Sequence, residues 1–461
     1  MSLSHQFQLT LREVRQALDA GTNPGGGGVA FSGVSTDTRT LRPGDLFVAL
    51  VGSRSDGHQH IAAALRAGAR GLVVSQPVVA SLDTPVLRVP DTEVAYGLLA
   101  RHWRDRFDIP VVGVTGSVGK TTVKEMLAAV LSPLGPVLKT EASQNNETGV
   151  PKTLLQMTPE HQAAAVEMGM RGAGQIAYLC GVARPTVGVV TAIADNHLEL
   201  LGSLDAIADA KGELLEALPA AGLAVLNADD PYLPRLQSKT AARVVTYGME
   251  ASDSESHFFP ADLARTDGGW RFVLRGVPVL VPSLSRHGVG NALAALAVAD
   301  ALGVPPEDAA RALRGYAAPP MRMQVVHTAG GATVLNDAYN AAPASVASAL
   351  ETLLAHPGGR RIAFLGDMRE LGARAEDAHR ELGAAIASVG GLDALYTVGG
   401  LAALIPGAAQ RFADSEDAAR FAREALALSP GDVVLVKGSR AVAMEKVVAA
   451  LTGEAAPEAG P

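Results

Sequence analysis

Short apolar runs alternate with amphipathic segments along most of the chain. In the middle of the sequence the runs "PVVGVTG", "AAAVEMG" and "TVGVVTAI" are apolar at successive positions rather than at every second one. Strands buried on both faces show this pattern, because helices cover both sides of a parallel sheet. Helix-like segments, such as residues 203–218, lie between the runs. The pattern therefore predicts an α/β protein with a parallel sheet.

The alternation changes character at three places along the chain. Before about residue 90 a few short strands accompany one helix, and regular alternation begins near residue 109. The stretch 250–285 is polar and less patterned, and a proline pair within residues 314–323 interrupts the pattern before it starts again. A chain of 461 residues suits three domains of roughly 100–200 residues. We predict domains over residues 1–90, 91–316 and 317–461, of which the last is Rossmann-like.

The composition and charge of the chain argue against some classes of function and location. The formal net charge of −8 argues against a nucleic-acid partner, although a local glycine loop with one lysine could still bind an anion. The single cysteine, Cys180, cannot form an internal disulfide, and we expect it to be a small buried residue on a helix. The N-terminus shows no signal-peptide pattern, and no apolar run is long enough to span a bilayer. These features predict a cytoplasmic protein without a transmembrane segment.

A glycine-bearing turn in "VVGVTGSVGKTTVKEML" connects an apolar strand to an amphipathic helix. Backbone N–H groups of such a turn and the helix N-terminus favour phosphate groups, Lys120 can reach the outer phosphates, and the Thr121 hydroxyl can bind Mg²⁺. A plain turn is the alternative, because Val114 occupies the position of the first Walker glycine. We expect this turn to bind a nucleoside triphosphate. A switch GTPase would normally carry a guanine-reading Asn-Lys-x-Asp motif, and the sequence has none. The predicted phosphate-binding residues are Gly116, Ser117, Val118, Gly119, Lys120, Thr121 and Thr122.

Further polar residues follow strands of the same predicted sheet, where ligands bind in open α/β folds. They are the polar stretch 141–151, Glu167 at the end of an apolar run, and His197. Each has a structural alternative, namely a surface loop, a helix cap and a structural histidine. Lys211 lies on a predicted helix and is either a solvated lysine or a buried amine. A buried neutral amine could take up CO₂ and become a carbamate, which is an anionic metal ligand.

Several longer motifs resemble those of the Mur ligase family, the ATP-dependent enzymes that build the peptide of bacterial cell-wall precursors. They are "KTEASQNNETGVPKTLL", "EMGMRGAGQI", "HLELLGS", "AKGE", "NDAYNAAPAS", "LGDMRELG" and "LVKGSRAVAMEKVV". The similarity spans nearly the whole chain. Within the family the chain is most similar to the member that adds D-alanyl-D-alanine. The Asp-Asn-Pro-Arg element of the diamino-acid-adding relative is absent.

The resemblance implies a fold and a reaction. An N-terminal domain would bind the UDP end of the substrate, a central P-loop ATPase-like domain would bind ATP, and the C-terminal domain would close over both. The implied enzyme is an ATP-dependent ligase that joins D-alanyl-D-alanine to UDP-N-acetylmuramoyl-tripeptide through an acyl phosphate, with Mg²⁺ as cofactor. It would act in peptidoglycan precursor synthesis, and we expect a monomer.

The resemblance also implies residue roles. The implied catalytic residues are Lys120, His197 and Lys211, the last as a carbamate. The implied metal ligands are Thr121, Glu167, His197 and Lys211. Outside the phosphate loop, the implied nucleotide-binding residues are Asn291, Arg322 and Asp337. The implied substrate-binding residues are Ser35, Asp37, Arg39, Asn145 and Asn146. The chain departs from the family pattern at several positions, among them Ser143, where the pattern has asparagine, and Asn336, where it has aspartate.

Three other functions compete with this interpretation. A folylpolyglutamate-type or other amino-acid-adding ligase would use the same chemistry on a different amine. A P-loop ATPase that moves a partner would hydrolyse ATP without any UDP-sugar. A binding module without catalysis is disfavoured, because all the residues expected to bind ATP phosphates and metal are present.

Overall fold

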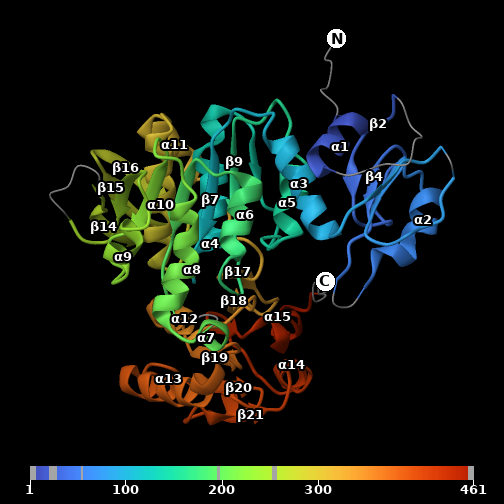
Figure 1. The fold of residues 1–461 in the computed structure, drawn as a ribbon. Helices are drawn as coiled ribbons and strands as arrows, with labels where there is room; N and C mark the ends of the chain where they lie inside the picture. Colours follow the sequence, from blue (N-terminus) through green and yellow to red (C-terminus); the bar gives the residue numbers. More distant parts are fainter. Residues whose placement is uncertain are drawn as a thin grey trace.

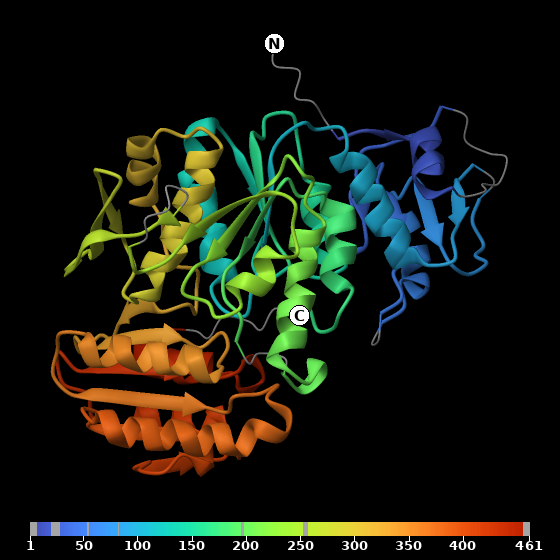
Figure 2. The ribbon, with the colours of Figure 1, turned by 60° about the vertical axis from the view of Figure 1, so that its left-hand side comes forward.

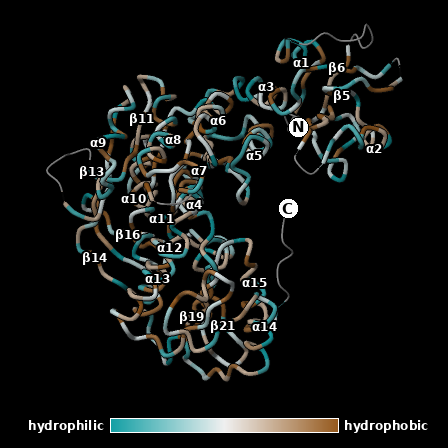
Figure 3. The backbone as a smooth tube through the Cα atoms, turned by 60° about the horizontal axis from the view of Figure 1, so that its bottom comes forward, coloured by the Kyte–Doolittle hydropathy of each residue, from teal (hydrophilic) through white to brown (hydrophobic). Residues whose placement is uncertain are grey.

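Figure 1 shows the chain as three α/β bodies in a computed structural model, with N-terminal residues in blue and C-terminal residues in orange and red. The N-terminal and C-terminal bodies both join the central one and lie apart from each other, as Figure 3 shows. The structure describes residues 7–19, 28–52, 55–81, 83–194, 198–251 and 257–454.

The N-terminal body is built on a small parallel sheet. Its strand order is β3-β4-β5-β6, and every neighbouring pair is parallel. A short antiparallel pair, β1 and β2, lies beside it. The elements are β1 (Leu9–Thr10), α1 (Leu11–Leu18), β2 (Ala30–Phe31), β3 (Val34–Ser35), β4 (Leu46–Val48), η1 (Gly57–His60), α2 (Ile61–Arg66), β5 (Gly71–Val74) and β6 (Val86–Arg88).

The central body contains a seven-stranded parallel sheet that is covered on both faces. Its order is β13-β12-β11-β10-β7-β9-β8, so β7 lies in the middle, next to β10 and β9. One apolar core joins one face to α4, α10 and α11, and a second joins the other face to α3, α5, α6 and α8. The strands are β7 (Val111–Thr115), β8 (Val137–Lys139), β9 (Ala163–Glu167), β10 (Val187–Val190), β11 (Leu223–Asn227), β12 (Arg243–Tyr247) and β13 (His257–Phe258).

Two helices of the central body begin where the sequence supplies a polar cap or a glycine. Thus the Ser203 hydroxyl accepts a hydrogen bond from Ala206 N at the start of α8, and α4 begins directly after Gly119. The helices are α3 (Thr92–Arg104), α4 (Lys120–Val130), η2 (Ser132–Leu134), α5 (Gly149–Leu154), α6 (Gln175–Ala183), α7 (Leu198–Leu201), α8 (Leu204–Glu216), α9 (Leu233–Gln237), α10 (His287–Ala301) and α11 (Pro306–Leu313).

The polar stretch 250–285, which showed little pattern in the sequence, contains an antiparallel sheet of three strands. These are β14 (Ala261–Thr266), β15 (Gly269–Leu274) and β16 (Val277–Val281). Phe272 and Val279 are buried against the core that contains α10. The register between β14 and β15 shifts between Ala261 and Ala264, which breaks the alternation that would have marked β14.

The C-terminal body is a second twisted sheet, of order β17-β18-β22-β19-β20-β21, in which only the β17–β18 pair is antiparallel. Figure 2 shows it below the central body, with the green helices α8 and α7 reaching toward it. Its elements are β17 (Gln324–His327), β18 (Thr333–Asp337), α12 (Pro343–Ala355), β19 (Arg361–Gly366), η3 (Gly372–Arg374), α13 (Ala375–Val389), β20 (Ala394–Val398), η4 (Ala402–Leu404), β21 (Gln410–Phe412), α14 (Ser415–Glu424), β22 (Val433–Lys437), η5 (Arg440–Val442) and α15 (Glu445–Thr452).

The predicted fold class is confirmed: the protein is α/β, with a parallel central sheet and a mostly parallel C-terminal sheet. The domain boundaries at residues 90 and 316 stay predictions. Cys180 is buried on α6, as expected, and burial raises the pKa of its thiol to about 12. None of the described helices combines the length and the apolar character that crossing a bilayer requires.

Candidate active site

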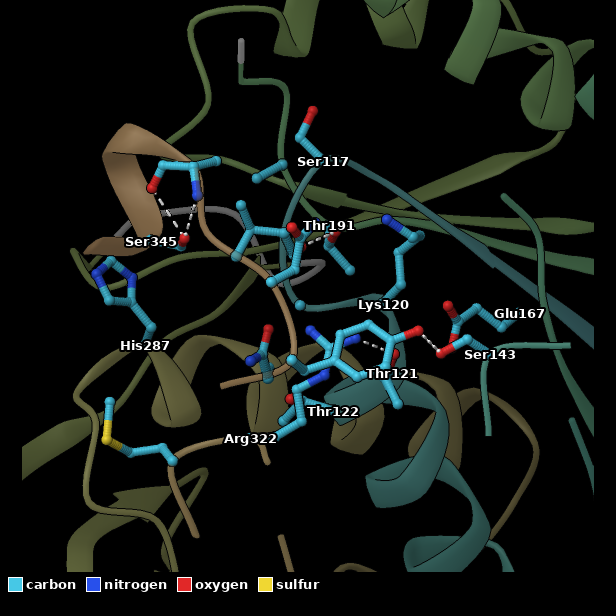
Figure 4. A pocket seen from close by; sticks show the side chains of 18 of the residues that line it. Ser117, Lys120, Thr121, Thr122, Ser143, Glu167, Thr191, His287, Arg322 and Ser345 are labelled. Atoms are coloured by element: carbon cyan, nitrogen blue, oxygen red, sulfur yellow. Dashed lines mark hydrogen bonds between the residues drawn. The ribbon is translucent and has the colours of Figure 1, made fainter. Parts of the chain in front are cut away.

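A cavity of about 2040 Å³ lies at the carboxyl ends of the central strands, and all three bodies contribute to its wall. Thr36 and Asp37 line it from the N-terminal body, the phosphate loop from the central body, and Tyr339 and Arg369 from the C-terminal body. The central sheet reverses its strand order around β7, which is where open α/β sheets bind ligands. Figure 4 shows Lys120, Thr121, Glu167 and Arg322 gathered in this cavity.

The phosphate loop, residues 116–119, turns sharply between β7 and α4. Gly116 and Gly119 have φ angles of +144° and +90°, which side chains of L residues rarely allow. The Lys120 ammonium lies back over the loop and donates a hydrogen bond to the Gly116 carbonyl at 2.7 Å. Burial lowers the pKa of Lys120, the Glu167 carboxylate opposes that shift, and the Arg322 guanidinium adds to it.

Two neighbouring side chains approach the loop so closely that a Cβ at Gly116 or Gly119 would collide with them. A Cβ on Gly116 would lie 1.9 Å from Thr191 Oγ1, and a Cβ on Gly119 would lie 2.6 Å from Asn291 Oδ1. The Thr191 hydroxyl follows β10 and donates to the Val118 carbonyl at 2.5 Å. Asn291, on α10, thus lies against the loop, and its predicted role in nucleotide binding stays a prediction. The sequence did not single out Thr191, since nothing local shows that β10 is the neighbour of β7.

Glu167 is the last residue of β9, and only one of its two carboxylate oxygens has a hydrogen-bond partner among the described residues. The residue is 1% exposed. Its Oε1 accepts a hydrogen bond from Asn145 Nδ2 at 2.8 Å, whereas its buried Oε2 has no hydrogen-bond partner among the described residues. A buried carboxylate oxygen without a partner is strongly destabilising unless a cation balances it. Together with the Thr121 hydroxyl at the start of α4, this donor set fits the oxygen-preferring ion Mg²⁺.

No cluster of three or more His, Cys, Asp or Glu side chains suited to a metal is found in the described ranges. His197, the histidine predicted as a metal ligand, lies outside the residues that the structure describes. Its role stays a prediction.

Lys211 lies on α8 and lines the cavity, although only 2% of the residue is exposed. Its ammonium makes no hydrogen bond or ion pair with any residue that the structure describes. Burial lowers the pKa of Lys211 well below its ordinary value, and the charge of Lys120 acts in the same direction. The alternative of a solvated lysine is therefore wrong. An uncharged amine is the form that can react with CO₂.

The C-terminal body brings Arg322 and Asp337 to the site. Arg322 Nη2 donates to Thr121 Oγ1 at 3.3 Å, and its guanidinium lies 4.0 Å from the centre of the Tyr339 ring. Asp337 Oδ2 accepts a hydrogen bond from Lys437 Nζ at 2.6 Å, and its Oδ1 accepts one from Met323 N at 3.0 Å. The Asp337–Lys437 ion pair thus joins β18 to β22. The bond from Met323 N joins Asp337 to the segment that carries Arg322. Lys437 is buried, and the sequence did not single out its role.

A hydrogen bond crosses directly between the central and C-terminal bodies beside the phosphate loop. The Tyr339 hydroxyl donates to Ser143 Oγ, the position where the family pattern has asparagine. Figure 4 draws this hydrogen bond as a dashed line that ends on Ser143. The C-terminal body is therefore anchored on the same loop that carries Asn145.

The predicted substrate-binding residues are only partly brought to the cavity. Asp37, Asn145 and Asn146 line it. Ser35 and Arg39 do not line it: the Ser35 hydroxyl donates to the Asp37 carbonyl at 3.0 Å, and the exposed Arg39 guanidinium pairs with the Asp37 carboxylate at 2.7 Å. Hydrogen bonds from Arg39 lower the pKa of Asp37, against burial that raises it.

Three family models match the chain. They are the catalytic domain of the Mur ligase family over residues 30–104, the Mur ligase middle domain over residues 114–299, and the glutamate ligase domain of Mur ligases over residues 321–440.

Relatives match over most of the length. The chain is 40% identical to the UDP-N-acetylmuramoyl-tripeptide–D-alanyl-D-alanine ligase of Synechocystis, over 92% of this chain and 93% of the relative. A crystal structure of MurF from Acinetobacter baumannii superposes with a TM-score of 0.89 at 30% identity, covering 97% of this chain and 100% of the other. MurF ligase from Thermotoga maritima in complex with ADP gives a TM-score of 0.79 at 30% identity, covering 92% and 97%.

The close approach of Asn291 to the phosphate loop generates a prediction. Gly119→Ala should weaken ADP binding by at least about tenfold, or about 1.4 kcal/mol, because the new methyl group collides with Asn291 and the φ angle of +90° disfavours alanine. Calorimetric titration with ADP measures this. Gly303→Ala is the matched control, since Gly303 has a φ angle of +82° with open space around it and lies away from the cavity. Equal ADP affinity for both variants would contradict the prediction.

Proposed function

The chain belongs to the Mur ligase family, and we propose that it is the ATP-dependent ligase that adds D-alanyl-D-alanine to UDP-N-acetylmuramoyl-tripeptide in peptidoglycan precursor synthesis. One observation carries the proposal: the phosphate loop opens into a single cavity whose wall comes from all three bodies. Such a cavity can hold a nucleotide, a long UDP-linked peptide and an amine together. The relatives named above, which match over nearly the whole chain, support this activity. A cytoplasmic location and a monomeric state stay predictions.

The reaction requires two transfers and no protein nucleophile. First, an oxygen of the tripeptide's terminal carboxylate forms a bond to the γ-phosphorus of ATP, and the bond from that phosphorus to the β–γ bridging oxygen breaks, so ADP leaves with the electron pair. Second, the amine of D-alanyl-D-alanine attacks the carbonyl carbon of the acyl phosphate. The carbon–oxygen bond to phosphate breaks, inorganic phosphate leaves, and the nitrogen loses its proton. The protein's part is positioning and charge neutralisation.

The chain's own groups can do this at the γ-phosphoryl. Backbone N–H groups of the phosphate loop and the N-terminus of α4 favour phosphate, and the Lys120 ammonium lies over the same loop. Arg322 reaches Thr121 from the C-terminal body and can add a second cation. Alignment of the reacting atoms can lower the barrier by roughly 7–11 kcal/mol, more than one charged contact provides. The placement of the three bodies is therefore as important as any single side chain.

Glu167 and Thr121 would hold Mg²⁺, with His197 and a carbamate on Lys211 as the further expected ligands. When bound, the ion would withdraw charge from the phosphoryl oxygens. The carbamate forms when the neutral Lys211 nitrogen attacks the carbon of CO₂: a nitrogen–carbon bond forms, one carbon–oxygen π pair moves to oxygen, and a proton goes to solvent. The product replaces a buried neutral amine with an anion that the nearby charge of Lys120 can balance.

We also propose that the segment 314–323 carries a closing motion of the C-terminal body. Arg322 and Met323 lie at its end, and Asp337 anchors Met323 while Arg322 contacts Thr121. A change at this hinge would therefore move Arg322 and Tyr339 relative to the phosphate loop. Closure of this kind aligns substrates and excludes water.

The joint substrate requirement tests the proposed function. A coupled assay measures the release of ADP. Release should occur only when ATP, UDP-N-acetylmuramoyl-tripeptide and D-alanyl-D-alanine are all present. Lys120→Ala should abolish this release. ADP release without the UDP-sugar would instead support an ATPase that moves a partner. Release with a folate and glutamate, but not with the cell-wall substrates, would support a folylpolyglutamate-type ligase. Either result would contradict the proposal.

The burial of Lys211 generates a separate prediction. Lys211→Ala should lower ligase activity at least about a hundredfold, because it removes a metal-binding anion. Short-chain carboxylic acids, such as formate or acetate, should restore part of that activity by occupying the space of the carbamate. Lys120→Ala is the control, because a carboxylate cannot replace a phosphate-binding cation. A Lys211→Ala variant that no carboxylic acid rescues would count against the carbamate.

A further inference from the structure

A second lysine on the helix of the phosphate loop is buried more deeply than Lys120 and has no part in the proposed mechanism. Lys124 lies one turn further along α4 and is 0% exposed. Its Nζ donates to the Thr140 carbonyl at 2.7 Å, lies 3.4 Å from the Ala142 carbonyl and pairs with Glu125 Oε1 at 2.9 Å. Since it does not line the cavity, it cannot touch a phosphate group.

Lys124 holds the segment that follows β8, which we call the 140–145 loop. Ala142 in this loop has a φ angle of +47°, a conformation that a non-glycine residue adopts only when its surroundings enforce it. Two carbonyl groups that converge on one ammonium supply such a restraint. The loop also carries Ser143, which accepts the hydrogen bond from Tyr339 of the C-terminal body.

The other side of the 140–145 loop braces Glu167. The Thr140 hydroxyl accepts a hydrogen bond from Glu167 N at 3.0 Å, and Asn145 Nδ2 donates to Glu167 Oε1 at 2.8 Å. The Asn145 carbonyl accepts a hydrogen bond from Gly169 N at 2.8 Å. The two backbone bonds hold the chain at the end of β9, the Asn145 bond orients the Glu167 carboxylate through Oε1, and Oε2 has no hydrogen-bond partner among the described residues.

We propose that Lys124 is a positioning residue: it fixes the 140–145 loop, the loop orients Glu167 through Asn145, and Lys124 thereby sets the affinity of the nucleotide-bound site for a divalent cation. This inference rests on the proposed function, because it assumes that the site binds Mg²⁺ together with the nucleotide. It assigns to Lys124 no contact with substrate.

The need to neutralise the charge of Glu125 does not by itself explain why a lysine is buried at position 124. The Glu125 carboxylate has a second cation in Lys139, whose ammonium pairs with Oε2. A fully buried ammonium is destabilising unless hydrogen bonds replace its water. Those hydrogen bonds go to the carbonyl groups of the 140–145 loop, so the loop is the element that depends on Lys124.

The test measures binding of ADP over a range of Mg²⁺ concentrations by calorimetry. In Lys124→Met the affinity for ADP without Mg²⁺ should stay within about twofold of the wild type, while the Mg²⁺ concentration that gives half the maximal effect should rise about 10–100-fold, as for other residues that orient a metal ligand. Lys139→Met is the matched control, because it removes the other cation of Glu125 and leaves the loop carbonyl groups untouched. It should show no change in Mg²⁺ dependence.

A double variant separates this role from a general structural one. Asn145→Ala should raise the Mg²⁺ requirement in the same way, and combining it with Lys124→Met should add little, because both changes release the same carboxylate. Should Lys124→Met fail to fold, as judged by circular dichroism, Lys124→Gln keeps a donor at this site and should give an intermediate shift.

The outcomes distinguish the inference from its premise. An unchanged Mg²⁺ dependence in Lys124→Met or Lys124→Gln, or full additivity with Asn145→Ala, would overturn the role of Lys124. If ADP binding by the wild-type protein does not respond to Mg²⁺, the proposed use of a Mg²⁺-bound nucleotide fails instead.

Discussion

The position of β7 in the middle of a parallel sheet is the constraint on which the site depends. Because β10 and β9 flank β7 in parallel register, Thr191 and Glu167 reach the phosphate loop from its two sides. The loop can accept Thr191 beside Gly116, and Asn291 beside Gly119, because neither glycine carries a side chain. The same strand order opens the cavity toward the N-terminal and C-terminal bodies, so substrates from both sides meet at the end of β7.

Buried charge is the second feature that unites the site. Glu167 and Lys211 are buried, burial lowers the pKa of both Lys120 and Lys211, and Glu167 Oε2 has no hydrogen-bond partner among the described residues. A site with unsatisfied buried groups is less stable than one with an apolar wall, and a polyanion with its cation satisfies these groups when it binds. Lys124 differs, because its bonds are internal and hold the 140–145 loop in place. The supporting lysine is thus hydrogen-bonded within the protein, whereas Glu167, Lys120 and Lys211 line the cavity.

The sequence predicted site features formed by consecutive residues, but it did not predict contacts that depend on the order of strands in the sheet. The phosphate loop could be read from its residues, because strand, glycine turn and helix are consecutive. Thr191 and Lys124 could not, since their partners are 73 and 16 residues away and the pairing of the strands is not visible locally. The sheet within 250–285 was missed because its strands have a half-polar face and an irregular register. Arg322 and Asp337 were assigned to the site by resemblance alone. The two alternatives for Lys211 differ in burial, and its burial is known only once α8 is packed in the structure.

In the proposed reaction the phosphate loop holds ATP so that its terminal phosphoryl group activates a carboxylate. Trapping of the activated acid tests this most directly: the protein is incubated with ATP, Mg²⁺ and UDP-N-acetylmuramoyl-tripeptide, with hydroxylamine in place of the dipeptide. We expect an ATP-dependent acyl hydroxamate of the tripeptide, identified by mass spectrometry, and none with Lys120→Ala. A protein that forms the final amide but never yields a hydroxamate would contradict it.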